Sequence, residues 1–89
     1  MRYAIIGLDK PNSQDLRNEV RNDHLTYIDD TGVVEQAGPL LDDNGNMCGS
    51  LIILDALNRE DAEGWVEDDP YSKAGLFQTV TVIEWKKVI

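Results

Sequence analysis

The sequence lacks several features that would place it in common classes of small protein. Its 89 residues include one cysteine, Cys48, which excludes an intrachain disulfide and a metal site made of several cysteines. No apolar run reaches the length of a membrane-spanning helix, and the segment before Asp9 is too short for the apolar centre of a signal peptide. We therefore expect one domain, residues 1–89, in a reducing, cytoplasmic setting.

Basic residues are also scarce. Eight Lys and Arg stand against 17 Asp and Glu, which gives a formal net charge of −9. Such a surface repels nucleic-acid phosphates and anionic membranes, so we expect neither as a partner. The content of 42% hydrophobic and 7% aromatic residues indicates a folded chain.

Hydrophobic periodicity and turn residues predict four strands and two helices in the order βαββαβ. The strands are expected at residues 2–9, 33–41, 50–56 and 77–88, and the helices at about residues 14–29 and after Asn58. This order is typical of an α+β, ferredoxin-like fold. In that fold both helices cover one face of a four-stranded antiparallel sheet.

Local signals predict how some of these elements begin and end. The pair Gly38-Pro39 is expected to distort or end the second strand, because proline cannot donate a hydrogen bond to a neighbouring strand. Asn58 is a typical helix cap. Leu57, just before it, is expected to pack on Ala62 as a hydrophobic staple.

The predicted strands are apolar on both faces. In the first strand Ile5 and Ile6 point to opposite faces, and the third has Ile52 on one face and Leu51 and Ile53 on the other. Two short helices can cover only one face of the sheet. The other would expose a large apolar patch, which soluble monomers avoid. We therefore expect a homodimer that packs sheet to sheet.

His24 is the only histidine and the first candidate for acid–base chemistry. The expected apolar stripe of its helix consists of Leu16, Val20, Tyr27 and Ile28. His24 lies at the edge of this stripe, and Arg17 and Arg21 precede it by seven and three residues on the same flank. Either His24 transfers protons, or it is a histidine at the edge of the core whose neighbouring arginines pair with Asp15 and Glu19.

The stretch from Asp68 to Gly75 predicts a short helical turn. Asp69 suits the capping position, Pro70 the first helical position, and Gly75 the end of the turn. A capping carboxylate can also face a catalytic base, because it has two oxygens. The local pattern does not decide whether Asp68 or Asp69 is that partner.

The turn at residues 42–46 begins like a calcium loop but does not continue as one. Counted from Asp42, the sixth position is Met47 and the twelfth is Ile53, where a calcium loop has Gly and Glu. We therefore expect no metal.

Four blocks of the sequence, in order, resemble the YCII-related family of the dimeric α/β-barrel group. They are residues 21–27 (RNDHLTY), 37–40 (AGPL), 49–53 (GSLII) and 69–77 (DPYSKAGLF). The resemblance implies a ferredoxin-like fold and a dimer closed through its sheets. It also implies a histidine and an aspartate paired in a cleft. Motif by motif these are His24 and Asp69, rather than Asp68.

Related members act without a cofactor. One of them removes chloride from a chlorinated hydroxyquinol-type aromatic, and the wider group includes muconolactone isomerases. We therefore expect a cofactor-free lyase or isomerase that acts on a small aromatic or lactone-like substrate, with His24 and Asp69 transferring the proton. The residues expected to contact the substrate, which we expect to be anionic, are Arg17, Arg21, Ser50 and Tyr71. The alternative is a non-catalytic ligand-binding or accessory dimer in which the histidine–aspartate hydrogen bond is structural.

Overall fold

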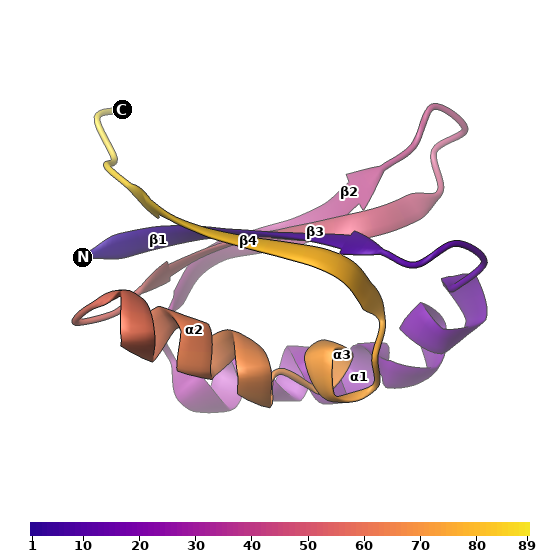
Figure 1. Cartoon of the computed structure of the whole chain (residues 1–89), viewed down its shortest axis with the longest axis horizontal. Coiled ribbons are helices and arrows are strands. Elements are labelled where there is room, and N and C mark those ends of the chain that lie inside the picture. The colour runs from indigo at the N-terminus through magenta and orange to yellow at the C-terminus, as the bar shows by residue number, and fades with distance from the viewer.

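Four antiparallel strands form one sheet in the order β2-β3-β1-β4, and every helix lies on the same face of it (Figure 1). The computed structural model describes residues 1–89. In chain order the elements are β1 (Arg2–Asp9), α1 (Gln14–Thr31), β2 (Val34–Leu41), β3 (Met47–Asp55), α2 (Arg59–Asp68), α3 (Pro70–Lys73) and β4 (Phe77–Trp85). This is the predicted ferredoxin-like fold, and α3 is the short helical turn predicted between Asp68 and Gly75.

The register of the sheet moves some of the predicted strand ends. β3 begins at Met47, before the predicted start at residue 50, because its pairing with β2 continues to Leu41 opposite Met47. β2 runs through Gly38-Pro39, so the alternative in which this pair ends the strand is wrong. Proline is tolerated there because β2 is an edge strand, with one side that needs no donor. β4 ends at Trp85, before the predicted end at residue 88.

Some helix ends follow the expected signals, but the cap expected at Asn12 or Ser13 is not formed, because Ser13 precedes α1 without a side-chain cap hydrogen bond. α1 is followed by Gly32, whose φ of 66° suits glycine. Asn58 caps α2, because its Oδ1 accepts a hydrogen bond from the backbone N–H of Asp61 at 2.8 Å. The staple is wrong: Leu57 is 84% exposed, while Ala62 is already enclosed by the core between α2 and the sheet.

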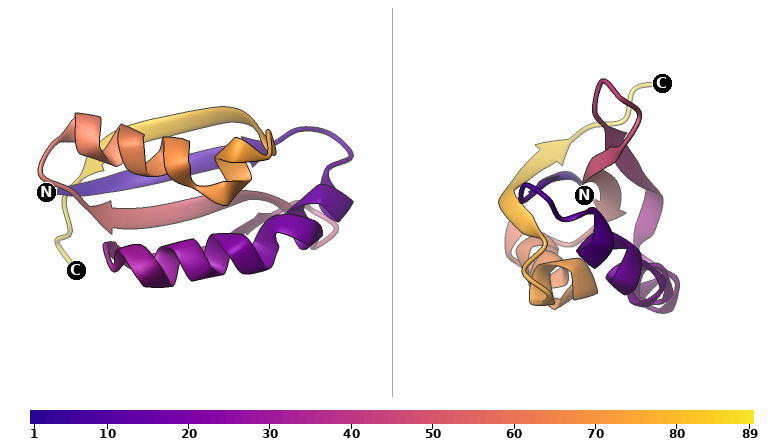
Figure 2. Two further views of the ribbon diagram at one scale, coloured as in Figure 1. Left: turned by 90° about the horizontal axis from the view of Figure 1, so that it is seen from below. Right: turned by 90° about the vertical axis from the view of Figure 1, so that its right-hand side faces the viewer.

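The core lies between the sheet and the helices, where α1 runs beside α2 and α3 (Figure 2). Its buried cluster consists of Tyr3, Ile5, Ile52, Leu54, Ala62, Trp65 and Val66. The apolar stripe predicted for α1 is only half-buried, and the two buried residues of α1 are Arg17 and His24. Tyr27 joins α1 to α2 by donating its hydroxyl to the carbonyl oxygen of Trp65 at 2.7 Å. The candidate site therefore lies on the core side of α1, where the polar residues Arg17 and His24 are buried.

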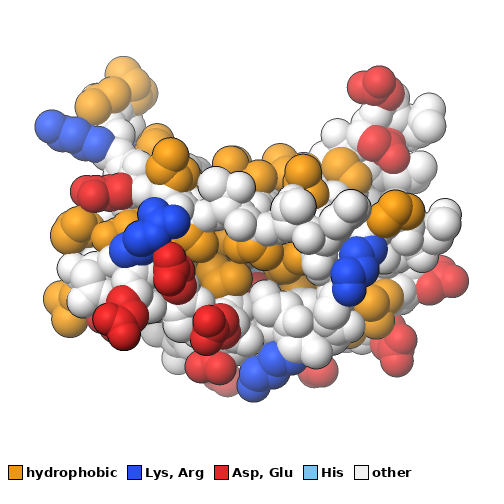
Figure 3. Space-filling view, in the orientation of Figure 1, with side chains coloured by type: hydrophobic (Ala, Val, Ile, Leu, Met, Phe, Trp, Pro, Cys, Tyr) orange, Lys and Arg blue, Asp and Glu red, His pale blue; other side chains and the backbone are white.

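The opposite face of the sheet, called the open face below, carries no helix. The register places mostly apolar residues on it, among them Ala4, Ile6, Leu8, Leu51, Ile53 and Ile83. Leu51 is 40% exposed and Ile83 54% exposed. Figure 3 shows hydrophobic side chains along this upper surface, between two raised ends of the molecule. The apolar open face expected from the strand pattern is present.

Candidate active site

His24 and Asp69 meet at the junction between α1 and the α2–α3 corner. The His24 Nδ1 lies 2.8 Å from Asp69 Oδ1, and the two side chains are 7% and 1% exposed. When Nδ1 donates to the carboxylate, Nε2 carries the lone pair and is the nitrogen that can accept a proton. Asp68, the competing candidate, is exposed at the end of α2. The geometry thus brings His24 to Asp69 and not to Asp68.

Asp69 is held in place by its own backbone role. It caps α3, which begins at Pro70, and its Oδ1 accepts a hydrogen bond from the backbone N–H of Tyr71 at 3.0 Å. Gly75, with φ of 73°, follows this turn. The capping prediction is therefore confirmed. The same oxygen, Oδ1, contacts both His24 and the backbone N–H of Tyr71, whereas the sequence suggested a separate oxygen for each. An ionised carboxylate oxygen has the two lone pairs that this needs.

Arg17 is buried and its charge is matched by Asp9. Its Nε donates to Asp9 Oδ2 at 2.7 Å, and its Nη2 donates to Asp9 Oδ1 at 3.0 Å and to Ser50 Oγ at 2.8 Å. Burial acts to lower the pKa of Arg17, but the hydrogen bonds and charge of Asp9 outweigh it and raise the pKa. The interpretation in which Arg17 pairs with Asp15 or Glu19 is wrong, because its side chain points into the core.

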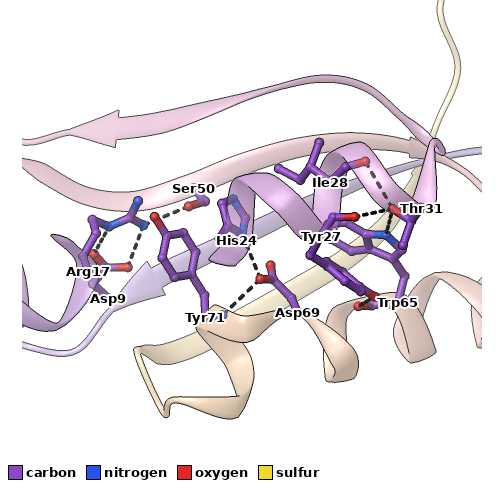
Figure 4. A network of polar contacts seen from close by, with 10 residues as sticks. All are labelled: Asp9, Arg17, His24, Tyr27, Ile28, Thr31, Ser50, Trp65, Asp69 and Tyr71. Carbon is purple, nitrogen blue, oxygen red and sulfur yellow. Dashed lines mark hydrogen bonds and ion pairs between the residues drawn. The ribbon is translucent and has the colours of Figure 1, made fainter. Parts of the chain in front are cut away.

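Tyr71 contacts both the His24–Asp69 pair and the Arg17–Asp9 pair (Figure 4). Its ring stacks on His24 with centroids 3.9 Å apart and planes 17° from parallel, and the Arg17 Cζ lies 4.7 Å from the same ring. Tyr71 is 1% exposed, and its hydroxyl has no hydrogen-bond partner in the chain. Burial raises the pKa of Tyr71 against the opposing charges of Arg17 and Arg21, so the phenol stays protonated at neutral pH.

A cavity of about 120 Å³ opens between α1, β2 and β3, and most of the predicted site residues line it. Its polar wall consists of Arg17, Arg21, His24, Ser50 and Tyr71, and its apolar wall includes Leu25, Ile28, Pro39 and Ile52. Arg21 is exposed and forms no ion pair, so its charge is available at the rim. An apolar cavity of about 150 Å³ holds benzene in another protein, so a six-membered ring would fill this smaller cavity and extend through its open side.

A larger hollow of about 470 Å³ lies under the other end of the sheet. It is mainly apolar, with Val33, Leu57 and Trp65 among its lining residues, and it contains none of the predicted site residues. The smaller cavity is the better candidate because a base, a free cation and two hydroxyls converge on it. No group of three or more His, Cys, Asp or Glu residues is arranged to hold a metal, and no helix is long and apolar enough to span a membrane.

Comparison with known proteins agrees with the resemblance seen in the sequence. A family model described as the YCII-related domain matches residues 1–86. The chain belongs to the YCII-related family. It is 35% identical over 97 residues to Protein YciI of Escherichia coli O6:H1, and 31% identical to an uncharacterized protein of Haemophilus influenzae. Each match covers 99% of both chains.

Two solved structures place this YCII-related chain among known folds. One is 5-chloro-2-hydroxyhydroquinone dehydrochlorinase from Burkholderia phenoliruptrix in complex with 2,5-dihydroxybenzoquinone, with a TM-score of 0.87 and 33% identity over 97% of this chain and 94% of that one. The other is an antibiotic biosynthesis monooxygenase, with a TM-score of 0.59 and 10% identity over 98% of this chain and 100% of that one. The second likeness shows the shared fold alone.

Sequence reasoning missed Asp9, the acid on which Arg17 depends. A signal for it was present, because Tyr3, Ile5 and Gly7 alternate onto the helix side of β1 and Asp9 continues that series. Nothing in the sequence marks the cavity as lying between α1 and the β2–β3 hairpin, since α1 meets this hairpin through tertiary packing.

Proposed function

We propose that this YCII-related protein is a cofactor-free enzyme of the lyase or isomerase type, in which His24 moves a proton on a small ring-shaped anion. The observation that carries the proposal is that His24, which lines the small cavity, lies 2.8 Å from Asp69 behind it. The likeness of this chain to a dehydrochlorinase over nearly its full length supports this class of reaction.

In the proposed step, His24 Nε2 accepts a proton from a substrate C–H or O–H group. The Asp69 carboxylate stabilises the imidazolium that forms. The electron pair released from the substrate bond then forms a new double bond. In a lyase a leaving group departs with its own electron pair. In an isomerase the imidazolium returns the proton to another carbon. Both routes balance without a redox partner.

The other polar residues have distinct proposed roles. Arg21 attracts the substrate anion at the rim, because its charge is uncompensated. Ser50 accepts from Arg17, which leaves its O–H free to donate to a substrate oxygen, and the Tyr71 hydroxyl is a second donor. Arg17 orders Ser50 and Tyr71 and does not meet the substrate with its full charge, since Asp9 neutralises it.

The test uses 2,5-dihydroxybenzoquinone as a probe ligand and a chlorinated hydroxyquinol as a trial substrate. We expect the wild type to bind the probe, and Arg21→Gln to weaken that binding about tenfold by loss of one charge-assisted hydrogen bond. Arg59→Gln, which removes a cation from exposed α2, should leave it unchanged. Chloride release by the wild type that persists undiminished in His24→Ala would refute the proton-transfer role.

A non-catalytic binding dimer is the second candidate, favoured by the almost complete burial of His24 and Asp69. Under this alternative His24→Ala lowers the free energy of unfolding by about 1–3 kcal/mol, because a buried carboxylate loses its partner. Probe binding would then survive with no turnover of any trial substrate. Measuring unfolding, binding and turnover on the same variant separates the two functions.

We also propose a homodimer formed through the open face. Its support is the exposed apolar surface around Leu51 and Ile83, which has no helix to cover it. Ile83→Asp should shift the protein toward monomer in sedimentation equilibrium. Leu57→Asp is a matched control, because Leu57 is even more exposed but lies outside the open face. A wild type that stays monomeric at micromolar concentration would contradict this proposal.

A further inference from the structure

The larger hollow lies at the end of the molecule where the N-terminus, the loop after α1 and the loop before α2 come together (Figure 2, left). Its volume is about 470 Å³, and it is called the end hollow here. Cavities of about 300–1,000 Å³ hold small-molecule ligands, so this one admits a ring with a short side chain. No residue with a proposed role in catalysis or substrate binding lines it.

The apolar wall of the end hollow is built around Trp65, whose position is fixed by two contacts. The Trp65 Nε1–H donates to Thr31 Oγ1 at 3.0 Å, and the Trp65 ring packs on Tyr27 with centroids 4.9 Å apart. The rest of this wall includes Val33, Leu54 and Ala56. Because the indole is already held in place, a ligand that packs on it loses little free energy to ordering of the protein.

Leu57 adds an uncovered apolar side chain at the rim of the end hollow. It is 84% exposed, since the packing on Ala62 that the sequence suggested does not form. A contact with an apolar ligand would remove part of this surface from water, which favours binding. The exposed position of Leu57 thus has a use that the fold itself does not supply.

The end hollow also carries one carboxylate whose charge is unmatched. Asp55 and Asp61 both line it, and the N-terminal ammonium group of Met1 forms an ion pair with Asp55 at 3.0 Å. Asp61 lies in the first turn of α2, is exposed and forms no ion pair. Its backbone N–H bonds Asn58, which leaves the Asp61 carboxylate free to accept a hydrogen bond from a ligand.

The two cavities therefore offer charges of opposite sign. The candidate active site has the free cation Arg21 at its rim, and the end hollow has the free anion Asp61. An anionic ligand at the end hollow would be repelled by Asp61 and by the net charge of −9. A carboxylate beside an apolar wall instead favours a cation with an apolar body, because a charge-assisted hydrogen bond adds to the apolar contact.

We propose that the end hollow is a second ligand site, which binds a primary ammonium ion attached to a small apolar group. The ammonium group donates to the Asp61 carboxylate, and the apolar group packs against Trp65 and Leu57. The charge determines which ligands are accepted, and the apolar contacts remove surface from water. This site is separate from the proposed proton transfer at His24 and does not depend on it.

The test titrates the wild-type protein with 2-phenylethylammonium and follows the indole N–H resonance of Trp65 by NMR. The chain has two tryptophans, so Trp85→Phe serves to assign this resonance. We expect a saturable shift with a dissociation constant below about 10 mM, the weak affinity of a ligand with few atoms. The uncharged 2-phenylethanol should bind about tenfold more weakly, and phenylacetate should leave the Trp65 resonance unchanged.

Two acids in the same turn of α2 give a matched pair of variants. Asp61→Asn should weaken binding of the ammonium probe by about tenfold, because the charge-assisted hydrogen bond is lost. Glu60→Gln removes the same charge outside the end hollow and should leave the affinity within about threefold of the wild type. Leu57→Ser should weaken binding of both the ammonium ion and the alcohol, and thermal unfolding shows that each variant is folded.

Several results would overturn this proposal. They are an unresponsive Trp65 resonance, equal binding of the alcohol and the ammonium ion, or equal losses in Asp61→Asn and Glu60→Gln. A probe that shifts the resonances of His24 and Tyr71 instead would lie in the candidate active site, which also contradicts a second site. Turnover by His24→Ala bears only on the proton transfer, so failure of either proposal is recognised separately.

Discussion

Replacement of Asp9 by asparagine should cost more stability than any other loss of a single charge in this chain. Asp9 and Arg17 are 5% and 3% exposed and share two hydrogen bonds. Asparagine keeps the shape and one acceptor oxygen but leaves the guanidinium charge buried and unmatched. Breaking a buried pair from one side costs about 3–5 kcal/mol. At about 0.05–0.15 kcal/mol per residue, the free energy of unfolding of the whole domain is roughly 4–13 kcal/mol.

The assay is urea unfolding followed by tryptophan fluorescence at a fixed protein concentration, since self-association would couple stability to concentration. Asp15→Asn is the matched control, because it removes the same charge from the exposed first turn of α1 and should cost less than about 1 kcal/mol. Asp9→Asn combined with Arg17→Met should recover part of the loss by removing the unmatched charge. A cost for Asp9→Asn no greater than that of Asp15→Asn would refute the buried-pair reasoning.

Three further predictions follow from single contacts. Asp69→Asn should keep α3, because asparagine also caps helices. It should lower any proton-transfer rate at His24 by at least about tenfold. Equal losses of stability and activity would contradict this prediction. Burial, and to a smaller extent the charge of Asp68, raises the pKa of Tyr27 to about 12. The stabilisation that this gives below pH 10 should therefore be lost as the pH rises toward 12. Tyr27→Phe should flatten that fall in urea midpoints measured across this range. Gly7→Ala places a Cβ 2.7 Å from the Phe77 ring and should lower the free energy of unfolding by about 1–3 kcal/mol, as thermal or urea unfolding will show.

The parts of the fold that sequence reasoning predicted depend on short-range rules. Alternation located β1, and the Asn58 cap located the start of α2, because the groups involved are close in the chain. Asp69 was also predicted as a cap from a short-range signal. Proline is favoured at the first position of a helix, so the residue before Pro70 takes the capping position. Its choice over Asp68 as the partner of His24 needed the family resemblance, and the geometry agrees.

The predictions that were wrong depend on how helices and strands pack against one another. The staple of Leu57 on Ala62 was ruled out by the enclosure of Ala62 in the core, which no local pattern records. The pairing of Arg17 with Asp9 joins a helix to the end of a strand. The acids nearest to Arg17 in the same helix, Asp15 and Glu19, are each two residues away and so do not share its face of the helix.

The shared oxygen of Asp69 makes the turn α3 and the histidine's orientation a single unit. Glutamate would keep the charge, but its extra methylene moves the carboxylate, so it cannot hold both the backbone N–H of Tyr71 and the ring of His24 in their present places. Swapping one acid for another is therefore not conservative at this position. A redesign of substrate preference should leave residues 69–71 untouched and vary the apolar wall on β2, where a changed side chain alters the shape of the cavity without loosening the aspartate.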